Sequence, residues 1–188
     1  MATDLAAIRD TPLGDPTLKD RWSKVSHLSF VGMVVRAEGG RFFAAARYSI
    51  KAPSVASAEA MTLLRGYELG TSLGLTSVIL ESDSRESISY ISGSLDSGSW
   101  EAFPILACVK QISGAFQHCR WSWVSRSSNM TANFLASRHF TEMCDCVWVD
   151  RPPFSLVHVL NMDGCLCAFL GVCLLLGILV TVGFSTLE

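Results

Sequence analysis

Residues 28–50 read LSFVGMVVRAEGGRFFAAARYSI, and this stretch decides the fold. Leu28 to Arg36 is a run of mostly apolar and β-branched residues. Glu38-Gly39-Gly40 then supplies turn chemistry, and Arg41 to Ile50 resumes the strand-like pattern. Two strand-like runs joined by a short, glycine-containing turn predict a β-hairpin.

Helical and strand patterns alternate after this hairpin. Pro53-Ser54 opens a helix that Gly74 ends, with apolar residues recurring at helical spacing between them. Shorter elements follow: a buried strand from Thr76 to Glu81, a helix from Asp83 to about Ile91, a helix from Trp100 to Ile112, a strand from Gln117 to Val124 and a last helix capped by Ser127 or Ser128. This order predicts an α/β domain, in which helices pack on a mixed sheet.

Charge and cysteine content limit the possible functions. The net charge of −2 argues against a protein that grips nucleic acid by bulk electrostatics, so any such contact is expected to be local or assisted by cations. The chain carries seven cysteines, an odd number without the spacing of a zinc site. These features favour free thiols in a reducing compartment.

Three polar residues stand where open α/β sheets place their sites. Glu59 lies near the start of the first long helix, Asp83 follows the buried strand, and Asn133 lies early in the last helix. Each also has a purely structural interpretation: Glu59 as a partner of a helix dipole, Asp83 as an N-cap and Asn133 as a solvated helix residue. Trp121 and Trp123 likewise fit either one face of a sheet or a base-stacking platform.

Five segments in order resemble the plant ribonuclease-H-like domain found in retroelement-derived and reverse-transcriptase-like proteins. They are Gly32 to Arg36 (GMVVR), Ser57 to Ala60 (SAEA), Glu81 to Ser84 (ESDS), Arg126 to Ala136 (RSSNMTANFLA) and Arg151 to Leu160 (RPPFSLVHVL). The likeness covers about residues 20–163. It implies a mixed five-stranded sheet flanked by helices.

The resemblance also implies a site. Members of that family that cleave hold two Mg²⁺ (or Mn²⁺) ions between four carboxylates. The two ions activate water and stabilise the leaving oxygen. Glu59 matches the helix carboxylate, and Asp83 matches the one that ends the fourth strand. Asp20 lies at about the distance expected of the first-strand carboxylate. Asn133 stands where the family has an aspartate on the last helix, and its amide brings no charge.

Two functions follow from this resemblance. The first is a nucleic-acid-binding domain that hydrolyses the RNA strand of RNA–DNA hybrids with two metal ions, as a hydrolase of the endonuclease class. The second is a catalytically inactive, membrane-tethered domain that binds nucleic acid or acts as a scaffold. We expect a monomer in either case.

The C-terminal residues 165–184 (CLCAFLGVCLLLGILVTVGF) contain no charge. A helix of about 20 residues spans about 30 Å, the thickness of the hydrocarbon core, so this run predicts a membrane anchor with the domain on the cytosolic side. A buried core helix in a soluble intracellular protein is the alternative. The chain therefore divides into a loose arm (1–19), the domain (20–163, ending in an irregular tail from 147) and the apolar helix.

Overall fold

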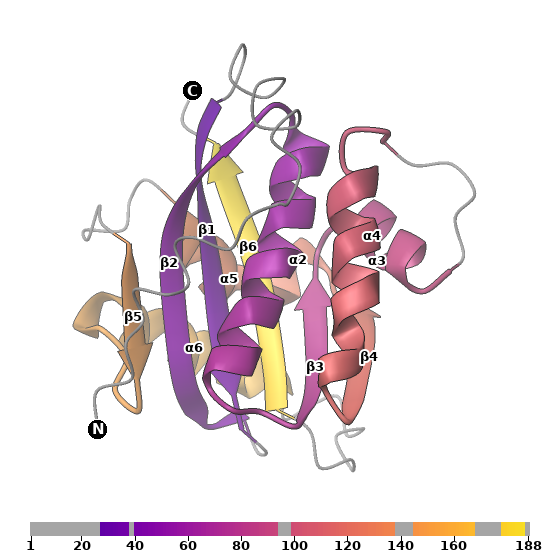
Figure 1. The fold of residues 1–188 in the computed structure, drawn as a ribbon. Helices are drawn as coiled ribbons and strands as arrows, with labels where there is room; N and C mark the ends of the chain where they lie inside the picture. Colours follow the sequence, from indigo (N-terminus) through magenta and orange to yellow (C-terminus); the bar gives the residue numbers. More distant parts are fainter. Residues whose placement is uncertain (1–26, 38–39, 94–98, 138–144, 168–177, 187–188) are drawn as a thin grey trace.

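The computed structural model describes residues 27–37, 40–93, 99–137, 145–167 and 178–186 (Figure 1). Its strands are β1 (His27–Arg36), β2 (Phe42–Ala52), β3 (Ser77–Ser82), β4 (His118–Trp123), β5 (Cys146–Val149) and β6 (Ile178–Thr186). Its α-helices are α2 (Val55–Ser72), α3 (Arg85–Ile91), α4 (Phe103–Ile112), α5 (Met130–Ala136) and α6 (Phe154–Cys167). Short 3₁₀ turns occupy Ser113–Ala115 and Arg126–Ser128.

The strands form a mixed sheet in the order β4-β3-β6-β1-β2-β5. The predicted hairpin is confirmed, because β1 and β2 pair antiparallel from His27 opposite Ala52 to Arg36 opposite Phe42. β3 and β4 run parallel, and β5 adds antiparallel to the outer edge of β2. The sheet thus has six described strands, where five were expected.

β6 lies in the middle of this sheet, between β1 and β3, although it is the last of the described strands in sequence order (Figure 1, yellow). It pairs antiparallel with β1, placing Val182 opposite Met33, and parallel with β3, placing Val182 opposite Ser82. Without β6, the described pairings would leave two separate pieces, β4-β3 and β1-β2-β5. The sheet is therefore continuous only because of residues 178–186.

The predicted apolar helix over 165–184 is wrong for residues 178–184, which belong to this strand. A strand buried on both faces is a continuous apolar run, and such a run has the same composition as a membrane-spanning helix. α6 does extend to Cys167, while residues 168–177 lie outside the described part of the chain. Within the described residues, no helix has the length and hydropathy to cross a membrane.

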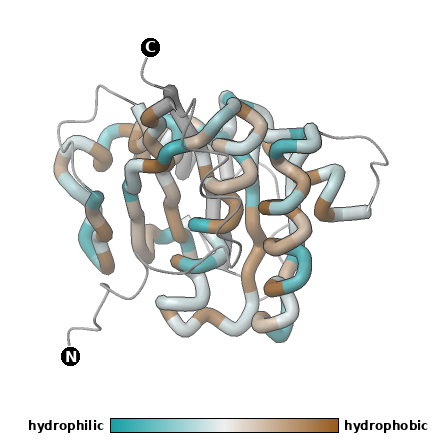
Figure 2. The backbone as a smooth tube through the Cα atoms, turned by 45° about the horizontal axis from the view of Figure 1, so that its top comes forward, coloured by the Kyte–Doolittle hydropathy of each residue, from teal (hydrophilic) through white to brown (hydrophobic). Residues whose placement is uncertain are grey.

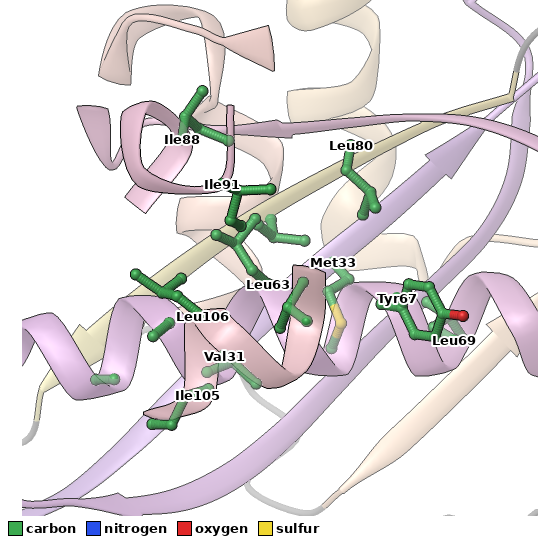
Figure 3. Packing of buried hydrophobic residues seen from close by; sticks show 14 of the residues in the cluster. Val31, Met33, Leu63, Tyr67, Leu69, Leu80, Ile88, Ile91, Ile105 and Leu106 are labelled. Atoms are coloured by element: carbon green, nitrogen blue, oxygen red, sulfur yellow. The ribbon is translucent and has the colours of Figure 1, made fainter. Parts of the chain in front are cut away.

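Helices cover both faces of the sheet. α2, α3 and α4 pack on one face, where Leu63 of α2 lies with Ile105 of α4 and with Val31 and Met33 of β1 (Figure 3). α5 and α6 pack on the other face in a smaller apolar cluster around Leu135 and Leu156. Apolar and hydrophilic residues alternate along the helices, as expected of elements with one buried side (Figure 2).

α5 lies unusually close to the sheet, because it crosses two glycines. A Cβ atom at Gly32 of β1 would lie 2.3 Å from the Ala132 carbonyl oxygen and 2.7 Å from the Ala136 nitrogen. A Cβ atom at Gly183 of β6 would lie 2.7 Å from Asn133 Oδ1. Only residues without a side chain permit this approach, which fixes the position of α5 at the end of the sheet.

Three local predictions need correction. The tail is not irregular, since β5 and α6 form within residues 146–167. Ser84, not Asp83, is the N-cap of α3, and its hydroxyl accepts from the Ser87 N–H. α5 begins at Met130 with no side-chain cap from a serine. The predicted arm, residues 1–19, lies outside the described residues.

Candidate functional site

Polar groups from four parts of the chain meet where the parallel strands β3 and β4 end beside Val182 of β6. Asp83 directly follows β3, and Asn129 and Asn133 lie at the start of α5, one helical turn apart. Glu59 comes from the first turns of α2. Val182 brings β6 to the same place, because its carbonyl oxygen accepts from Asn129 Nδ2 at 2.7 Å.

Asp83 receives donors from three side chains. Asn129 Nδ2 donates to its Oδ1 at 3.1 Å, and Asn133 Nδ2 donates to its Oδ2 at 3.4 Å. The Arg126 guanidinium lies 3.8 Å from Oδ2. Both oxygens of the carboxylate are therefore engaged by N–H groups of the chain itself, which supply the hydrogen bonds that an ionised carboxylate needs when it leaves water.

The two asparagines turn their nitrogens toward Asp83 and their oxygens away from it. Oδ1 of Asn129 and Oδ1 of Asn133 are buried and lack a hydrogen-bond partner among the described residues. The Asn133 oxygen faces the backbone at Gly183, as the close approach there shows. A carboxylate accepts but does not donate, so this orientation is the one that Asp83 dictates.

Glu59 is held separately. The Ser84 hydroxyl donates to Glu59 Oε2 at 2.5 Å, and Ser84 is the residue after Asp83, so the two carboxylates lie at the same end of the sheet. Burial raises the pKa of Glu59, the Ser84 hydrogen bond lowers it, and the charge of Asp83 raises it further. The structure thus brings Glu59, Asp83 and Asn133 together, while Asp20 lies outside the described residues.

These residues do not fit a pair of Mg²⁺ ions. Mg²⁺ takes oxygen ligands in near-octahedral geometry, but the asparagines present nitrogen to Asp83, and an N–H donor cannot coordinate a cation. The residue of β6 that borders the site is Val182, which is apolar and fully buried. In the part of the chain that the structure describes, no three His, Cys, Asp or Glu side chains are grouped to hold a metal ion.

Four residues of this site were not identified from the sequence. Asn129 stands four residues before Asn133, a spacing that puts both on one face of a helix and would have pointed to it. Ser84 and Arg126 lie within the quoted motifs, but no pattern shows that they contact Glu59 and Asp83. Val182 was hidden in a run interpreted as a helix.

A protein of known structure shares this fold. The solved structure of RNase H1 from the halophilic archaeon Halobacterium salinarum NRC-1 is similar in fold, with a TM-score of 0.56 and 21% identity over 60% of this chain and 86% of that chain. The N-terminal RNase H domain of a Mycobacterium tuberculosis protein, solved as a fusion with maltose-binding protein, matches with a TM-score of 0.45 and 18% identity. The match covers 56% of this chain and 93% of that chain. No curated protein sequence matches the chain.

The sheet order and the helices on its two faces define an RNase H-like domain. The sequence model of the reverse transcriptase-like family matches residues 19–139, more than half of the chain, and the chain belongs to that family. β6 lies beyond this matched segment, although it is the central strand of the sheet.

Proposed function

We propose that this domain binds nucleic acid through the end of the sheet that carries Asp83, and that it does so without hydrolysing the bound strand. One observation carries the proposal: side-chain N–H groups of Asn129, Asn133 and Arg126 surround the carboxylate that the resemblance assigns to metal binding. Asp83 and the three side chains that contact it, which we call the ion cluster, therefore have the charges and hydrogen bonds of a structural site.

The absence of hydrolysis follows from this arrangement. A two-metal reaction needs several oxygen ligands turned toward one point, so that the ions can clamp the attacking and leaving oxygens. Asp83 could offer a cation only the lone pairs that the two asparagine N–H groups leave unused. Asn133 would also have to turn its oxygen out from Gly183.

Nucleic-acid binding is supported by what surrounds the ion cluster and by the family. The Arg126 side chain is 73% exposed, and Arg85 stands exposed at the start of α3. Guanidinium groups at such positions bind phosphate oxygens in pairs of parallel hydrogen bonds. Local cations of this kind agree with a chain whose net charge is only −2, because no broad basic face is required.

Hydrolysis of RNA–DNA hybrids is the second candidate, and the resemblance motivates it. It is favoured by the placement of Glu59 and Asp83 at one end of the sheet. It requires Mg²⁺ or Mn²⁺ to bind Asp83 beside the N–H donors or in their place. The two candidates therefore differ in their dependence on a divalent ion.

The test measures binding and cleavage together on fluorescently labelled RNA–DNA hybrid, single-stranded RNA and duplex DNA. We expect saturable binding that is the same in EDTA and in Mg²⁺, with all strands intact after long incubation. Binding should weaken as salt increases, because phosphate contacts release counterions.

Two other outcomes are decisive. No saturable binding to any of the three probes would end the proposal. Cleavage that needs Mg²⁺ or Mn²⁺ and disappears in Asp83→Ala would establish the hydrolytic function in its place. Membrane localisation and the monomeric state stay predictions, which carbonate extraction and light scattering test.

A further inference from the structure

We propose that Trp123, Arg85 and Arg126 form a surface for an unpaired base and its flanking phosphates, so that the domain prefers single-stranded nucleic acid. The inference rests on the proposed function and names the substrate class of that same site. We call these three residues the indole surface.

The indole of Trp123 is held in place with much of its surface uncovered. It ends β4 and is 49% exposed, whereas Trp121, two residues earlier on the same side of the strand, packs against the core. Its Nε1 donates to the Asp83 carbonyl oxygen at 3.2 Å. The polar atom of the ring is thus satisfied within the protein, and the exposed part of the ring is apolar. A fixed, exposed aromatic ring of this kind is what base stacking uses.

One guanidinium group lies over the ring, and a second contacts the same aspartate that the ring contacts. The Arg85 guanidinium carbon lies 6.0 Å from the centre of the Trp123 ring, at the outer limit of a cation–π contact. Arg126 is within reach of Asp83 at 3.8 Å, but most of its side chain is in solvent. Exposed ion pairs contribute only about 0–1 kcal/mol, so Arg126 can turn to a phosphate at little cost.

This combination favours an unpaired strand over a duplex. In a duplex, each base is stacked between its neighbours, and an aromatic ring reaches a base face only where a base is unstacked. An exposed ring with guanidinium groups near it suits a single strand, in which the backbone carries a phosphate on either side of each base. The surface has no feature that distinguishes one base from another, so binding should tolerate any sequence.

The experiment compares affinities of the full chain for labelled single-stranded oligonucleotides and for duplexes of the same sequence, by fluorescence anisotropy in EDTA. Trp123→Leu removes the ring, and we expect it to weaken single-strand binding by about 5- to 100-fold, the range for one stacked base. Trp123→Phe keeps a ring but loses the N–H bond, and it should stay within about threefold of wild type. Arg85→Gln and Arg126→Gln should each lower the salt dependence by about one phosphate contact.

Phe154→Leu is the matched control. Phe154 is 95% exposed but follows β5, at the opposite edge of the sheet from β4, so its loss should leave binding unchanged. Circular dichroism confirms that each variant is folded. Equal affinity of wild type and Trp123→Leu for the single strand would overturn the indole surface while leaving nucleic-acid binding intact. Tighter binding of the duplex would also overturn it. No binding of any probe would remove the proposed function itself.

Discussion

Replacing Gly32 with alanine should strongly destabilise the domain. Among the described glycines with negative φ, we expect this position to show the largest loss of stability. The new Cβ would meet two backbone atoms of α5, Ala132 O at 2.3 Å and Ala136 N at 2.7 Å, and also Leu135 Cβ at 2.7 Å. Backbone atoms cannot rotate away, so α5 must move as a unit. Overpacking in a core typically costs about 1–3 kcal/mol, and we expect about 3 kcal/mol here.

Two further glycines make this a graded series. At Gly183 the single contact under 3.0 Å is the amide end of Asn133, which can rotate, and backbone atoms of α5 lie at 3.0 and 3.1 Å. Gly183→Ala should therefore cost about 1–2 kcal/mol. At Gly114 an added Cβ would meet nothing within 4 Å, and Gly114→Ala should be neutral or stabilise by up to about 1 kcal/mol. The expected order of stability is therefore Gly114→Ala, then Gly183→Ala, then Gly32→Ala.

Urea unfolding followed by circular dichroism measures the series. A loss of about 3 kcal/mol in a domain of this size corresponds to a fall of about 6–12 °C in Tm. If Gly32→Ala is as stable as wild type, α5 does not lie against β1 as described. If Gly183→Ala costs more than Gly32→Ala, the explanation by backbone rigidity fails.

Two further predictions concern the sheet. Burial raises the pKa of Glu81 from 4.5 to about 6, with Arg36 opposing the shift, so the folded protein holds a proton there that the unfolded chain releases at lower pH. The stability that the protonated Glu81 contributes is therefore present below pH 4.5 and is lost as the pH rises through 6. The loss amounts to about 2 kcal/mol. The free energies of unfolding of wild type and Glu81→Gln, measured in urea, should differ by this pH-dependent amount. Removing residues 178–188 should abolish cooperative unfolding, because β1 and β3 lose the strand between them; a truncated chain with the midpoint and m-value of wild type would refute the central placement of β6.

Short-range patterns in the sequence predicted much of the fold. The hairpin, α2 and β3 each carry their signal within a few residues: turn glycines, a helical stripe, or a β-branched run. Their bounds in the structure differ by only a few residues from those expected. The sequence also singled out Glu59, Asp83 and Asn133, and in the structure these three residues share one end of the sheet.

What sequence reasoning missed depends on contacts between distant segments. β6 pairs with β1 and β3, from which it is separated by most of the chain. Because α2 and α5 cover its two faces, its sequence lacks the alternation that marks a strand. The direction of the asparagine amides depends on Asp83, and that geometry cannot be derived from residue types. The resemblance predicted which residues meet, but it did not predict that N–H donors would face the carboxylate.

The position of β6 has a consequence for how the protein is made. Ribosomes synthesise a chain from its N-terminus at about 5–20 residues per second, and domains generally fold as units. Here a strand at the middle of the sheet is the last of the described strands to be synthesised. Until it emerges, β1 and β3 expose two unpaired edges, which can pair with other chains. We expect nascent chains of this protein to depend on chaperones until residues 178–186 have left the ribosome.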